Sequence, residues 1–596
     1  MTRYQRREFL KTTALSGAAI LALKSWPVAA SSSAPKTFAL ENYVSKSFNY
    51  LTRMVDKQGQ PYFNVFWTDP AEAAHDWPDF GDVQSRQLQA AVMAKVMTGQ
   101  EAPTEKVWRE RILSFIEPRT GLLVRPETSY SRPVADLGDQ ALTLYALVTA
   151  YADSGDLRLL AACRKMADGI AEKSIHLNPF RARWQDGFLI KGLMACARYA
   201  DYEPAYRLAG KLVERVFVIR PLPTRQNTLR PGAHVHGSLR ALVGAADYAL
   251  YAGDRELLGR VDALYSFVKS KGTRFGFLPE VIDRKGDIVA CETCALMDYI
   301  GLAATLANHG HPEYWEDVER IARNHLVESQ VDDVSWLVSG GDREDTAQFT
   351  WNDVGKRMVG GYAGWSSPTH ILACKETLNA QWGGPELRNK TRAFQNCCGG
   401  SGTHAFFEVW KNAARFEDGV LSVNLHIDKL LPQAEIRCFQ PYQGLLTVKV
   451  LKPCRLKVRI PGFVRAGELK VDSGTGAAAV RISGNYVELG ERNPSESIRI
   501  SYPLPVTSEE TSIGNSGFRQ YHYRVTYKGN TVVKMEPHGN DVRTAYSEFS
   551  LKQIPVFYGE EGPGRLYRRE HMLKDLDPEL SAIHLDDGKL DLWYFR

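Results

Sequence analysis

Hydrophobic residues recur at intervals of three and four positions along most of the chain between about residue 39 and residue 330. This period is typical of amphipathic α-helices. It predicts helices over residues 39–55, 82–98, 104–116, 138–153, 156–174, 187–201, 203–216, 236–252, 254–270, 293–308 and 312–328. Short breaks such as DSGD at 153–156 and AGD at 252–254 separate neighbouring helices, as they do in antiparallel helical hairpins. Ten to twelve helices arranged in pairs favour an (α/α)6 barrel over a helical bundle.

From about residue 418 the pattern changes to an alternation of hydrophobic and polar residues, with Gly and Pro between the alternating stretches. These stretches are GVLSVNLHI, LLTVKVL, RLKVRIPGF, AAVRISGNYVEL and SIRISYPLPV. A period of two with turn residues between strands predicts a β-sandwich. The region 330–417 is poorly periodic and rich in Gly, Trp, Asp and Asn, which indicates long loops followed by one helix near 401–414. Long loops in a compact domain are often functional.

The expected fold class is therefore mainly α plus β, an (α/α)6 barrel followed by β-sandwich structure. We expect a barrel domain that carries the chemistry over residues 31–417, a β-sandwich domain over 418–510 and a β-rich C-terminal extension over 511–596. The pattern does not indicate a role for the extension.

The first 30 residues have the features of an export signal. The motif QRREFLK at 5–11 contains the twin arginines Arg6 and Arg7, an apolar run extends from Ala14 to Leu23, and small residues follow at 28–30. The run is about half as long as a membrane-spanning helix, and no later stretch of eighteen apolar residues occurs. We expect a twin-arginine signal peptide, a periplasmic or extracellular protein and no transmembrane segment. An uncleaved N-terminal anchor is the alternative.

Composition excludes several other classes of protein. The chain has 596 residues, of which 44% are hydrophobic and 24% charged, as in ordinary globular proteins. Most of the net charge of +5 lies in the first 30 residues, which carry five basic residues and one acidic residue. Because nucleic-acid binding normally requires a basic domain or stripe, no nucleic-acid partner is expected. The oligomeric state cannot be inferred from these features.

Nine cysteines, an odd number in a large chain, argue against a disulfide framework. Four of them lie within helix-like or strand-like apolar stretches and are interpreted as core residues: Cys163, Cys196, Cys438 and Cys454. The remaining cysteines include two unusual groups, Cys291-Glu292-Thr293-Cys294 at the start of one predicted helix and Cys397-Cys398 just before another.

These two groups form a candidate metal site. Glu292, Cys294, Cys397 and Cys398 offer three thiolates and one carboxylate, a complete set for tetrahedral Zn²⁺. Adjacent cysteines point to opposite faces of a strand, so convergence on one ion requires irregular backbone, which the following Gly399-Gly400 can supply. The alternative is a set of unconnected buried cysteines.

Several motifs together resemble glycoside hydrolase family 127, typified by bacterial β-L-arabinofuranosidase. They are ETC at the start of a helix, CC about a hundred residues later, DGVLSVNLHIDK, LKVRIPGF and ISYPLPV. The resemblance covers about residues 80–505 and implies an (α/α)6 barrel with β-sandwich domains and a retaining hydrolase. It also implies a zinc held by Glu292, Cys294, Cys397 and Cys398, with Cys397 as nucleophile and Glu280 as general acid/base.

The family pattern is not followed everywhere. Glu280 lies only twelve residues before Glu292, so Asp283, Asp287 and Glu344 remain rival acid/base candidates. The family commonly has Pro-Pro-Asn after its cysteine pair where this chain has Gly399-Gly400-Ser401, and a His where this chain has Gly138-Asp139-Gln140. A closed structural zinc is the other interpretation of a site with four protein ligands.

Further polar and aromatic residues are candidates for sugar binding. His234 and His236 precede a predicted helix where the family has a substrate-binding His. Trp77 lies in HDWPD at 75–79, and Trp365 and His370 lie in the long loop region. Aromatic faces suit the C–H groups of sugars, although loop aromatics are as often simple packing residues.

The sequence thus predicts an exported, zinc-dependent, retaining exo-glycosidase of the β-L-arabinofuranosidase type, acting on an oligosaccharide or polysaccharide. One alternative is a hydrolase of an acidic or branched-chain sugar, such as aceric acid or a uronyl residue, on the same scaffold. The other is a non-catalytic carbohydrate-binding protein with a structural zinc. The sugar and its linkage are left open.

Overall fold

The structure is a computed structural model of the whole chain. It describes residues 37–536 apart from 67–69, 175–182, 220, 284–289, 333, 335–336, 338–339, 341–342, 369–370, 372–393, 474–480 and 516–518. The predicted signal peptide, Asp287, His370 and most of the predicted C-terminal extension lie outside these residues.

Six helices of the described part form a closed inner ring, in which each helix contacts the next and the last contacts the first. These inner helices are α4 (Gln84–Thr98), α6 (Leu137–Ser154), α8 (Arg183–Tyr199), α10 (Val235–Ala252), α12 (Thr293–Asn308) and α15 (Asn396–Asn412). Inner helices are covered on all sides, so they are apolar nearly all round, as in the α12 stretch ALMDYIGLAATLA.

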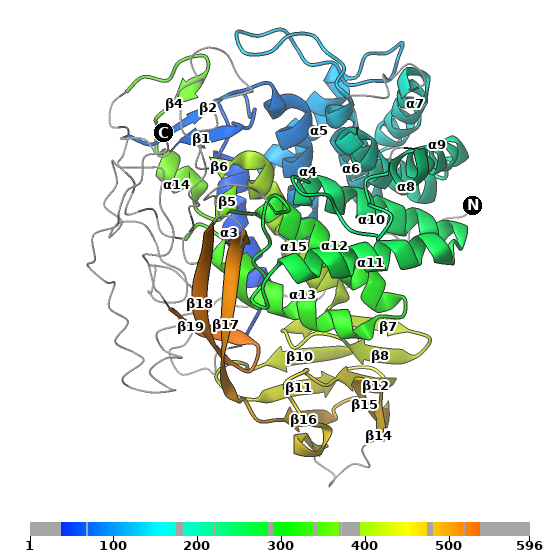
Figure 1. Cartoon of the computed structure of the whole chain (residues 1–596). Helices are drawn as coiled ribbons and strands as arrows, with labels where there is room; N and C mark the ends of the chain where they lie inside the picture. The colour runs from blue at the N-terminus through cyan, green and yellow to red at the C-terminus, as the bar shows by residue number, and fades with distance from the viewer. Residues whose placement is uncertain are drawn as a thin grey trace.

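A second layer of helices covers the ring from outside (Figure 1). These helices are α3 (Leu40–Arg53), α5 (Pro103–Phe115), α7 (Leu157–Ser174), α9 (Glu203–Glu214), α11 (Arg255–Lys271) and α13 (Trp315–Ile321). Each has one apolar face: in α9, for example, Ala205, Leu208, Ala209 and Leu212 are buried while Glu203 and Glu214 are exposed. Paired inner and outer helices in a closed ring confirm the predicted barrel architecture.

The remaining helical segments are short. They are η1 (Asp79–Val83), η2 (Arg215–Ile219), η3 (Pro312–Tyr314), η4 (Ala322–Leu326), α14 (Val354–Met358) and η6 (Ala466–Glu468). The predicted helix 312–328 is thus divided into η3, α13 and η4. None of the helices in the described residues has the length and apolar content required to cross a membrane.

Two five-stranded sheets below the barrel form the sandwich (Figure 1). The first has the order β13-β16-β11-β10-β9 and the second β14-β15-β12-β8-β7, in which β8 and β12 are parallel. The strands are β7 (Ala414–Glu417), β8 (Val420–Val423), β9 (Lys429–Leu430), β10 (Ala434–Cys438), β11 (Leu445–Val450), β12 (Cys454–Arg459), β13 (Lys470–Asp472), β14 (Arg481–Ser483), β15 (Tyr486–Arg492) and β16 (Ser497–Ser501). Alternate residues such as Ile436, Val448 and Val458 fill a separate core, which confirms the period-two prediction.

A three-stranded antiparallel sheet follows the sandwich and packs on the barrel. It consists of β17 (Val506–Asn515), β18 (Arg519–Lys528) and β19 (Thr531–Glu536), coloured orange in Figure 1. Tyr523, Tyr527 and Val533 belong to the barrel's hydrophobic core, and the backbone N–H of Val532 donates to Asn324 Oδ1 at 2.8 Å. β17 runs through position 510, where the sequence pattern placed a domain boundary.

One buried carboxylate, Glu319, ties these parts together. It accepts hydrogen bonds from Arg323 Nε at 3.0 Å, from the backbone N–H of His426 at 2.9 Å and from Asn530 Nδ2 at 3.1 Å. It also pairs with Arg459 of β12. The barrel, the sandwich and the C-terminal sheet therefore share one fully buried polar cluster, and such clusters hold a single relative arrangement when every member is satisfied.

Short strands anchor the starts of two inner helices. β3 (Cys291–Glu292), immediately before α12, pairs with β5 (Trp365–Ser366). β6 (Phe394–Gln395), immediately before α15, pairs with β1 (Asn64–Phe66), which also pairs with β2 (Glu72–Ala74) and through it with β4 (Phe349–Thr350). The loop region 330–417 and the N-terminal segment thus fix where the two cysteine-bearing helices begin.

The helix predicted near 401–414 begins earlier, at Asn396. Cys397 and Cys398 therefore lie inside the first turn of α15. The sequence analysis expected them in irregular backbone before the helix, and this prediction was wrong. Adjacent helical residues differ by about 100° in direction, so both side chains can face the same site without irregular backbone.

Candidate active site and metal-binding cluster

Three cysteines converge at the end of the barrel where the inner helices begin. Cys294 is the second residue of α12 and Cys397 the second residue of α15, with Cys398 beside it. The sulfur atoms of Cys294, Cys397 and Cys398, here called the cysteine cluster, lie within 4.8 Å of one another. The positive end of a helix dipole favours thiolates, so two helix N-termini at one place suit this cluster.

The three thiols differ in their surroundings. Cys294 and Cys398 have sulfurs 3.2 Å apart, too far for a disulfide bond, and all three cysteines are free. Cys294 is 0% exposed, Cys398 1% and Cys397 7%. Since a group that attacks a substrate must be reached from outside, Cys397 is the best placed of the three.

The cluster also favours negative charge on Cys397. Hydrogen bonds with Cys294 and then Cys398 lower the pKa of Cys397 to about 6. Burial raises the pKa of Cys294 and that of Cys398 well above their ordinary value. The surroundings therefore favour negative charge on Cys397 over Cys294 and Cys398.

The glycines after Cys398 allow α15 to pack closely at this point. A Cβ atom on Gly399 would clash with the Tyr50 hydroxyl, and one on Gly402 would clash with the Tyr362 ring. Tyr50 in turn donates to the carbonyl of Asn396, the first residue of α15, at 3.3 Å. Gly399 and Gly402 are thus required for the packing of α15 in this chain.

Two carboxylates lie beside the cluster. Glu292 is the N-cap residue of α12, and its carboxylate accepts from His234 Nε2 at 2.9 Å. Glu280 accepts from the indole Nε1 of Trp365 at 3.0 Å. Because Trp365 pairs with Glu292 across β3 and β5, the two carboxylates are brought together, and His234, Glu280 and Glu292 have ligand atoms within 4.8 Å of one another.

His236 lies on the other side of Glu292. Its ligand atom lies within 4.8 Å of those of Glu292 and Cys294. His236 Nδ1 lies 3.0 Å from Asp298 Oδ2, and Arg240 Nη1 donates to Asp298 Oδ1 at 3.1 Å. Burial acts to raise the pKa of Asp298, but Arg240 and His236 hold it below its usual range. His236 is therefore fixed in orientation by an ionised carboxylate.

The donor set fits a zinc ion. The predicted ligands lie in two overlapping groups that share Cys294: the cysteine cluster itself, and Cys294 with Glu292, a group that also contains the predicted substrate-binding residue His236. Three buried sulfurs converging from two helices are typical of Zn²⁺ coordination, and carboxylate and imidazole are its other common donors. Of the four residues predicted as ligands, the three cysteines thus form one group, and Glu292 is joined to them through Cys294.

The other predicted site residues lie as follows. Trp77 has one ring face covered by the Arg125 guanidinium at 3.7 Å, and Arg125 is bonded to the buried Asp139 at 2.6 Å. Asp283 pairs with Lys271 at 2.9 Å, and Glu344 is exposed. Of the acid/base candidates in the described residues, only Glu280 lies close to Glu292 and His234 beside the cluster.

The cysteines interpreted as core residues are buried, as predicted: Cys163, Cys196, Cys438 and Cys454.

The sequence analysis did not identify three residues around the cluster: Arg86, Ser401 and Asp298. Arg86 of α4 has Nη1 3.8 Å from Cys294 Sγ and 3.1 Å from Ser401 Oγ, and Asp298 holds His236. One signal was available: four consecutive polar residues, Gln84-Ser85-Arg86-Gln87, open a helix whose later residues are mostly apolar. Polar residues at the start of an inner helix point to the end of the barrel where the site lies.

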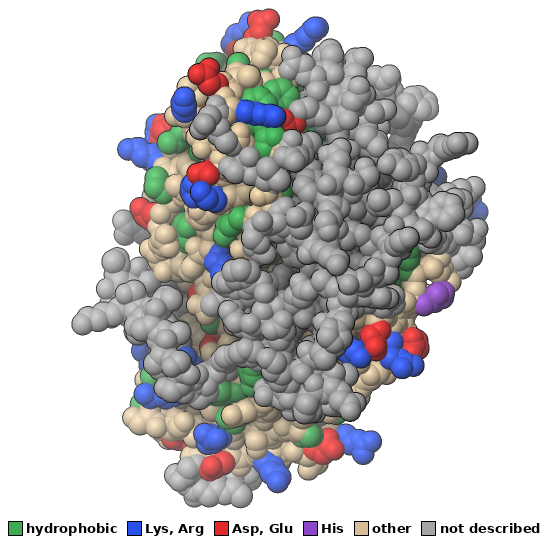
Figure 2. Space-filling model, turned by 90° about the vertical axis from the view of Figure 1, so that its left-hand side faces the viewer, with side chains coloured by type: hydrophobic (Ala, Val, Ile, Leu, Met, Phe, Trp, Pro, Cys, Tyr) green, Lys and Arg blue, Asp and Glu red, His purple; other side chains and the backbone are tan. Residues whose placement is uncertain are grey.

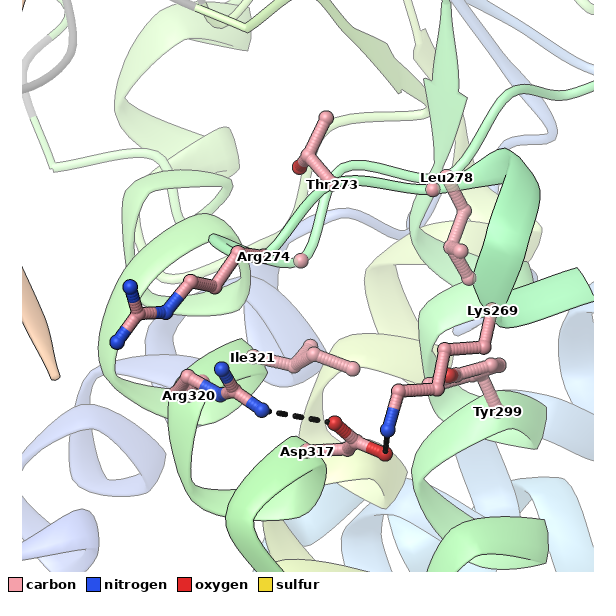
Figure 3. Close-up of a pocket in the computed structure, with 10 residues that line it drawn as sticks. Lys269, Thr273, Arg274, Leu278, Tyr299, Asp317, Arg320 and Ile321 are labelled. Atoms are coloured by element: carbon pink, nitrogen blue, oxygen red, sulfur yellow. Dashed lines mark hydrogen bonds and ion pairs between the residues drawn. The ribbon is translucent and has the colours of Figure 1, made fainter. Parts of the chain in front are cut away.

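A separate cavity of about 220 Å³ lies between the end of α11, the loop 272–278 and α13 (Figure 3). Its cationic groups are paired, since Asp317 binds both Lys269 at 2.5 Å and Arg320 at 3.1 Å, while Arg274 pairs with Glu509 of β17 at 3.5 Å. No residue of the cysteine cluster lines this cavity.

The surface shown in Figure 2 carries interspersed acidic and basic side chains. Among the residues that are described on this face, no continuous basic stripe is present.

A scan of the sequence against protein-family models gives no match, and a search of curated proteins gives none. Solved structures do match. One described as a glycoside hydrolase is 12% identical with a TM-score of 0.57, covering 84% of each chain. A GH127 β-L-arabinofuranosidase from Geobacillus stearothermophilus T6 is 14% identical with a TM-score of 0.54, covering 88% of this chain and 84% of its own. A further GH127 β-arabinofuranosidase is 13% identical with a TM-score of 0.53, covering 83% and 81%.

These matches extend over most of each chain and therefore describe the whole fold, not one domain. The present chain has the fold of the GH127 structures, as the resemblance of its motifs predicted.

Proposed function

We propose that this protein is a zinc-dependent, retaining exo-glycosidase of the β-L-arabinofuranosidase type. The observation that carries the proposal is the convergence of three buried thiols at one end of an (α/α)6 barrel, with Glu292 beside Cys294 and Glu280 beside Glu292. The GH127 names of the matching structures support a furanoside as the substrate class.

Cys397 is the proposed nucleophile. A retaining glycosidase needs one group that attacks the anomeric carbon and a second that protonates the leaving oxygen. Cys397 is the most exposed member of the cluster, and its lowered pKa of about 6 favours the attacking thiolate. Attack forms a bond between its sulfur and the anomeric carbon as the bond to the leaving oxygen breaks, and water later displaces the sulfur.

Glu280 is the proposed general acid/base. It would give a proton to the departing oxygen in the first step and take one from water in the second. The Trp365 indole holds its carboxylate by the 3.0 Å hydrogen bond, and Glu292 lies close by. His234, His236 and Trp365 lie around Glu280 and Glu292, and we propose that they contact the sugar.

Glu292, Cys294, Cys397 and Cys398 would hold the zinc. When bound, zinc keeps thiols deprotonated at neutral pH and fixes their positions. Cys294 and Cys398, the more deeply buried pair, serve only to bind it in this proposal.

Turnover of aryl glycosides tests the function directly. A panel that includes both anomers of arabinofuranoside, together with uronyl and pyranosyl substrates, should show hydrolysis of the β-L-arabinofuranoside. Preference for a uronyl substrate would favour the acidic-sugar alternative. Absence of turnover on the whole panel, in protein that contains zinc, would favour a carbohydrate-binding protein with a structural metal.

Metal content provides a separate test. The purified protein should contain about one zinc per chain, as four donors around one position allow. Replacing Cys294 with alanine is expected to remove that zinc, because Cys294 belongs to both donor groups. Elemental analysis of the two proteins measures the difference. Cys291→Ala, which removes a neighbouring buried thiol outside the cluster, should leave zinc unchanged. Undiminished zinc in Cys294→Ala would exclude Cys294 as a ligand.

We also propose export by the twin-arginine pathway, with a mature chain that starts near Ser31. The motif at residues 5–11 supports this proposal. In cell fractionation, a double variant Arg6→Lys, Arg7→Lys should remain inside the cell, whereas Arg3→Lys, a change outside the motif, should be exported. Normal export of the double variant contradicts the targeting proposal.

A further inference from the structure

Arg86 is a buried cation in direct contact with the cysteine cluster. Its side chain is 6% exposed. Nη1 lies 3.1 Å from Ser401 Oγ and 3.8 Å from Cys294 Sγ, and Nη2 lies 3.4 Å from His236 Nε2. One guanidinium therefore contacts groups from α10, α12 and α15, while its own backbone belongs to α4.

Three groups besides Cys294 contact this guanidinium: Asp82, Ser401 and His236. Asp82, one turn earlier in η1, pairs with Nε. Ser401 Oγ donates to the carbonyl of Cys397 at 2.9 Å, which leaves its lone pairs toward Arg86. His236 Nε2 lies 3.4 Å from Nη2 of Arg86, and Asp298 lies 3.0 Å from His236 Nδ1. The N–H group directed at Cys294 is thus placed by partners on several elements.

The charge balance of this region explains why an arginine is buried here. A buried arginine normally pairs with carboxylates, and a buried charge without compensation is costly. Asp82 is one such partner; the other N–H groups of Arg86 face a hydroxyl, an imidazole and a sulfur. Three thiolates and one carboxylate around one divalent ion leave a net negative charge, which an adjacent guanidinium offsets.

We infer that Arg86 is an outer-sphere positioning residue of the metal site, which donates to the Cys294 sulfur and raises the affinity for zinc. The inference rests on the zinc binding proposed above. Partners that hydrogen-bond to metal ligands are typically worth about 10- to 100-fold in metal affinity. The same loss is therefore expected when Arg86 loses its guanidinium.

The test is the zinc dissociation constant of the full chain, measured by competition with a chelating indicator. Arg86→Met should bind zinc about 10- to 100-fold more weakly than the original protein. Arg86→Lys keeps the charge but lacks the planar fork, and should bind with an intermediate affinity at least about threefold weaker. Arg492→Met, which removes a half-buried guanidinium in the sandwich, should bind zinc normally.

Thermal unfolding of the metal-free proteins separates zinc affinity from general stability. If Arg86→Met does not fold, the zinc affinity of Arg86→Lys tests the inference instead. Zinc binding by a folded Arg86 variant with the affinity of the original protein would overturn the inference and leave the proposed function intact. Failure of the original protein to bind zinc at all would instead contradict the proposed function on which the inference depends.

Discussion

Replacing Cys397 with alanine is expected to abolish glycoside hydrolysis. A covalent route has no substitute for its nucleophile, and removal of such a group in other hydrolases lowers turnover by about 10⁴- to 10⁶-fold. Cys398→Ala should act through the metal, because its sulfur is only 1% exposed and lies 3.2 Å from that of Cys294. Turnover of Cys398→Ala should therefore recover in part with excess zinc, and that of Cys397→Ala should not.

Turnover must be compared per bound zinc, since both cysteines are proposed ligands. Cys163→Ala, which removes a buried thiol far along the chain in α7, serves as the control and should keep full activity. Recovery of Cys397→Ala on addition of zinc would show that this residue only binds the metal, and the nucleophile would then have to be sought among the neighbouring carboxylates.

Replacing Glu280 with alanine has the second largest expected effect. Loss of a general acid typically lowers the rate by about 10²- to 10⁴-fold. The loss in kcat should be smallest on substrates with good leaving groups, which need little protonation. An external nucleophile such as azide should restore part of the rate, because it replaces the water that Glu280 would activate. Rates on a series of aryl glycosides of graded leaving-group pKa measure this dependence.

Asp283→Ala is the matched control for Glu280. Asp283 lies three residues later and is paired with Lys271 at 2.9 Å. Its loss should leave hydrolysis within about twofold of the original, as surface changes usually do. A leaving-group dependence in Asp283→Ala, together with its absence in Glu280→Ala, would transfer the acid/base role to the rival carboxylate.

Much of the barrel was predictable because its signal is local. The predicted helix 293–308 agrees with α12 at both ends, and 236–252 agrees with α10 within one residue. Apolar residues at intervals of three and four, ended by Gly155 and Gly253 in the left-handed conformation, determine such helices without help from the rest of the chain.

The start of α15 was not predictable in the same way. Its first residues include Gly399, Gly400 and Gly402, which disfavour a helix by local propensity. Gly399 packs against Tyr50, which lies hundreds of positions earlier in the sequence, and Gly402 packs against Tyr362 of another loop. These contacts override the local propensity. Tertiary contact decides the conformation here, so the sequence placed the cysteine pair in a loop and the structure places it in a helix.

The residues of the candidate site also fall into two groups: those that could be identified from the sequence and those that could not. Glu292, Cys294, Cys397 and Cys398 could be selected from residue type, from their positions at predicted helix starts and from the resemblance of their motifs to a known family. Arg86, Ser401 and Asp298 are common residue types, and what makes them notable is proximity: Arg86 meets Ser401 across 315 positions of sequence. Such contacts become visible only once the ring of helices is closed.

The identity of the nucleophile is tested most directly by trapping it. A mechanism-based furanoside inhibitor that opens on attack should leave its mass on the peptide that contains Asn396-Cys397-Cys398. Fragmentation of that peptide by mass spectrometry assigns the modified residue. The account predicts a sugar adduct on Cys397, at one equivalent per chain and in competition with substrate. An adduct on Cys398, or on a carboxylate such as Glu292, would contradict it.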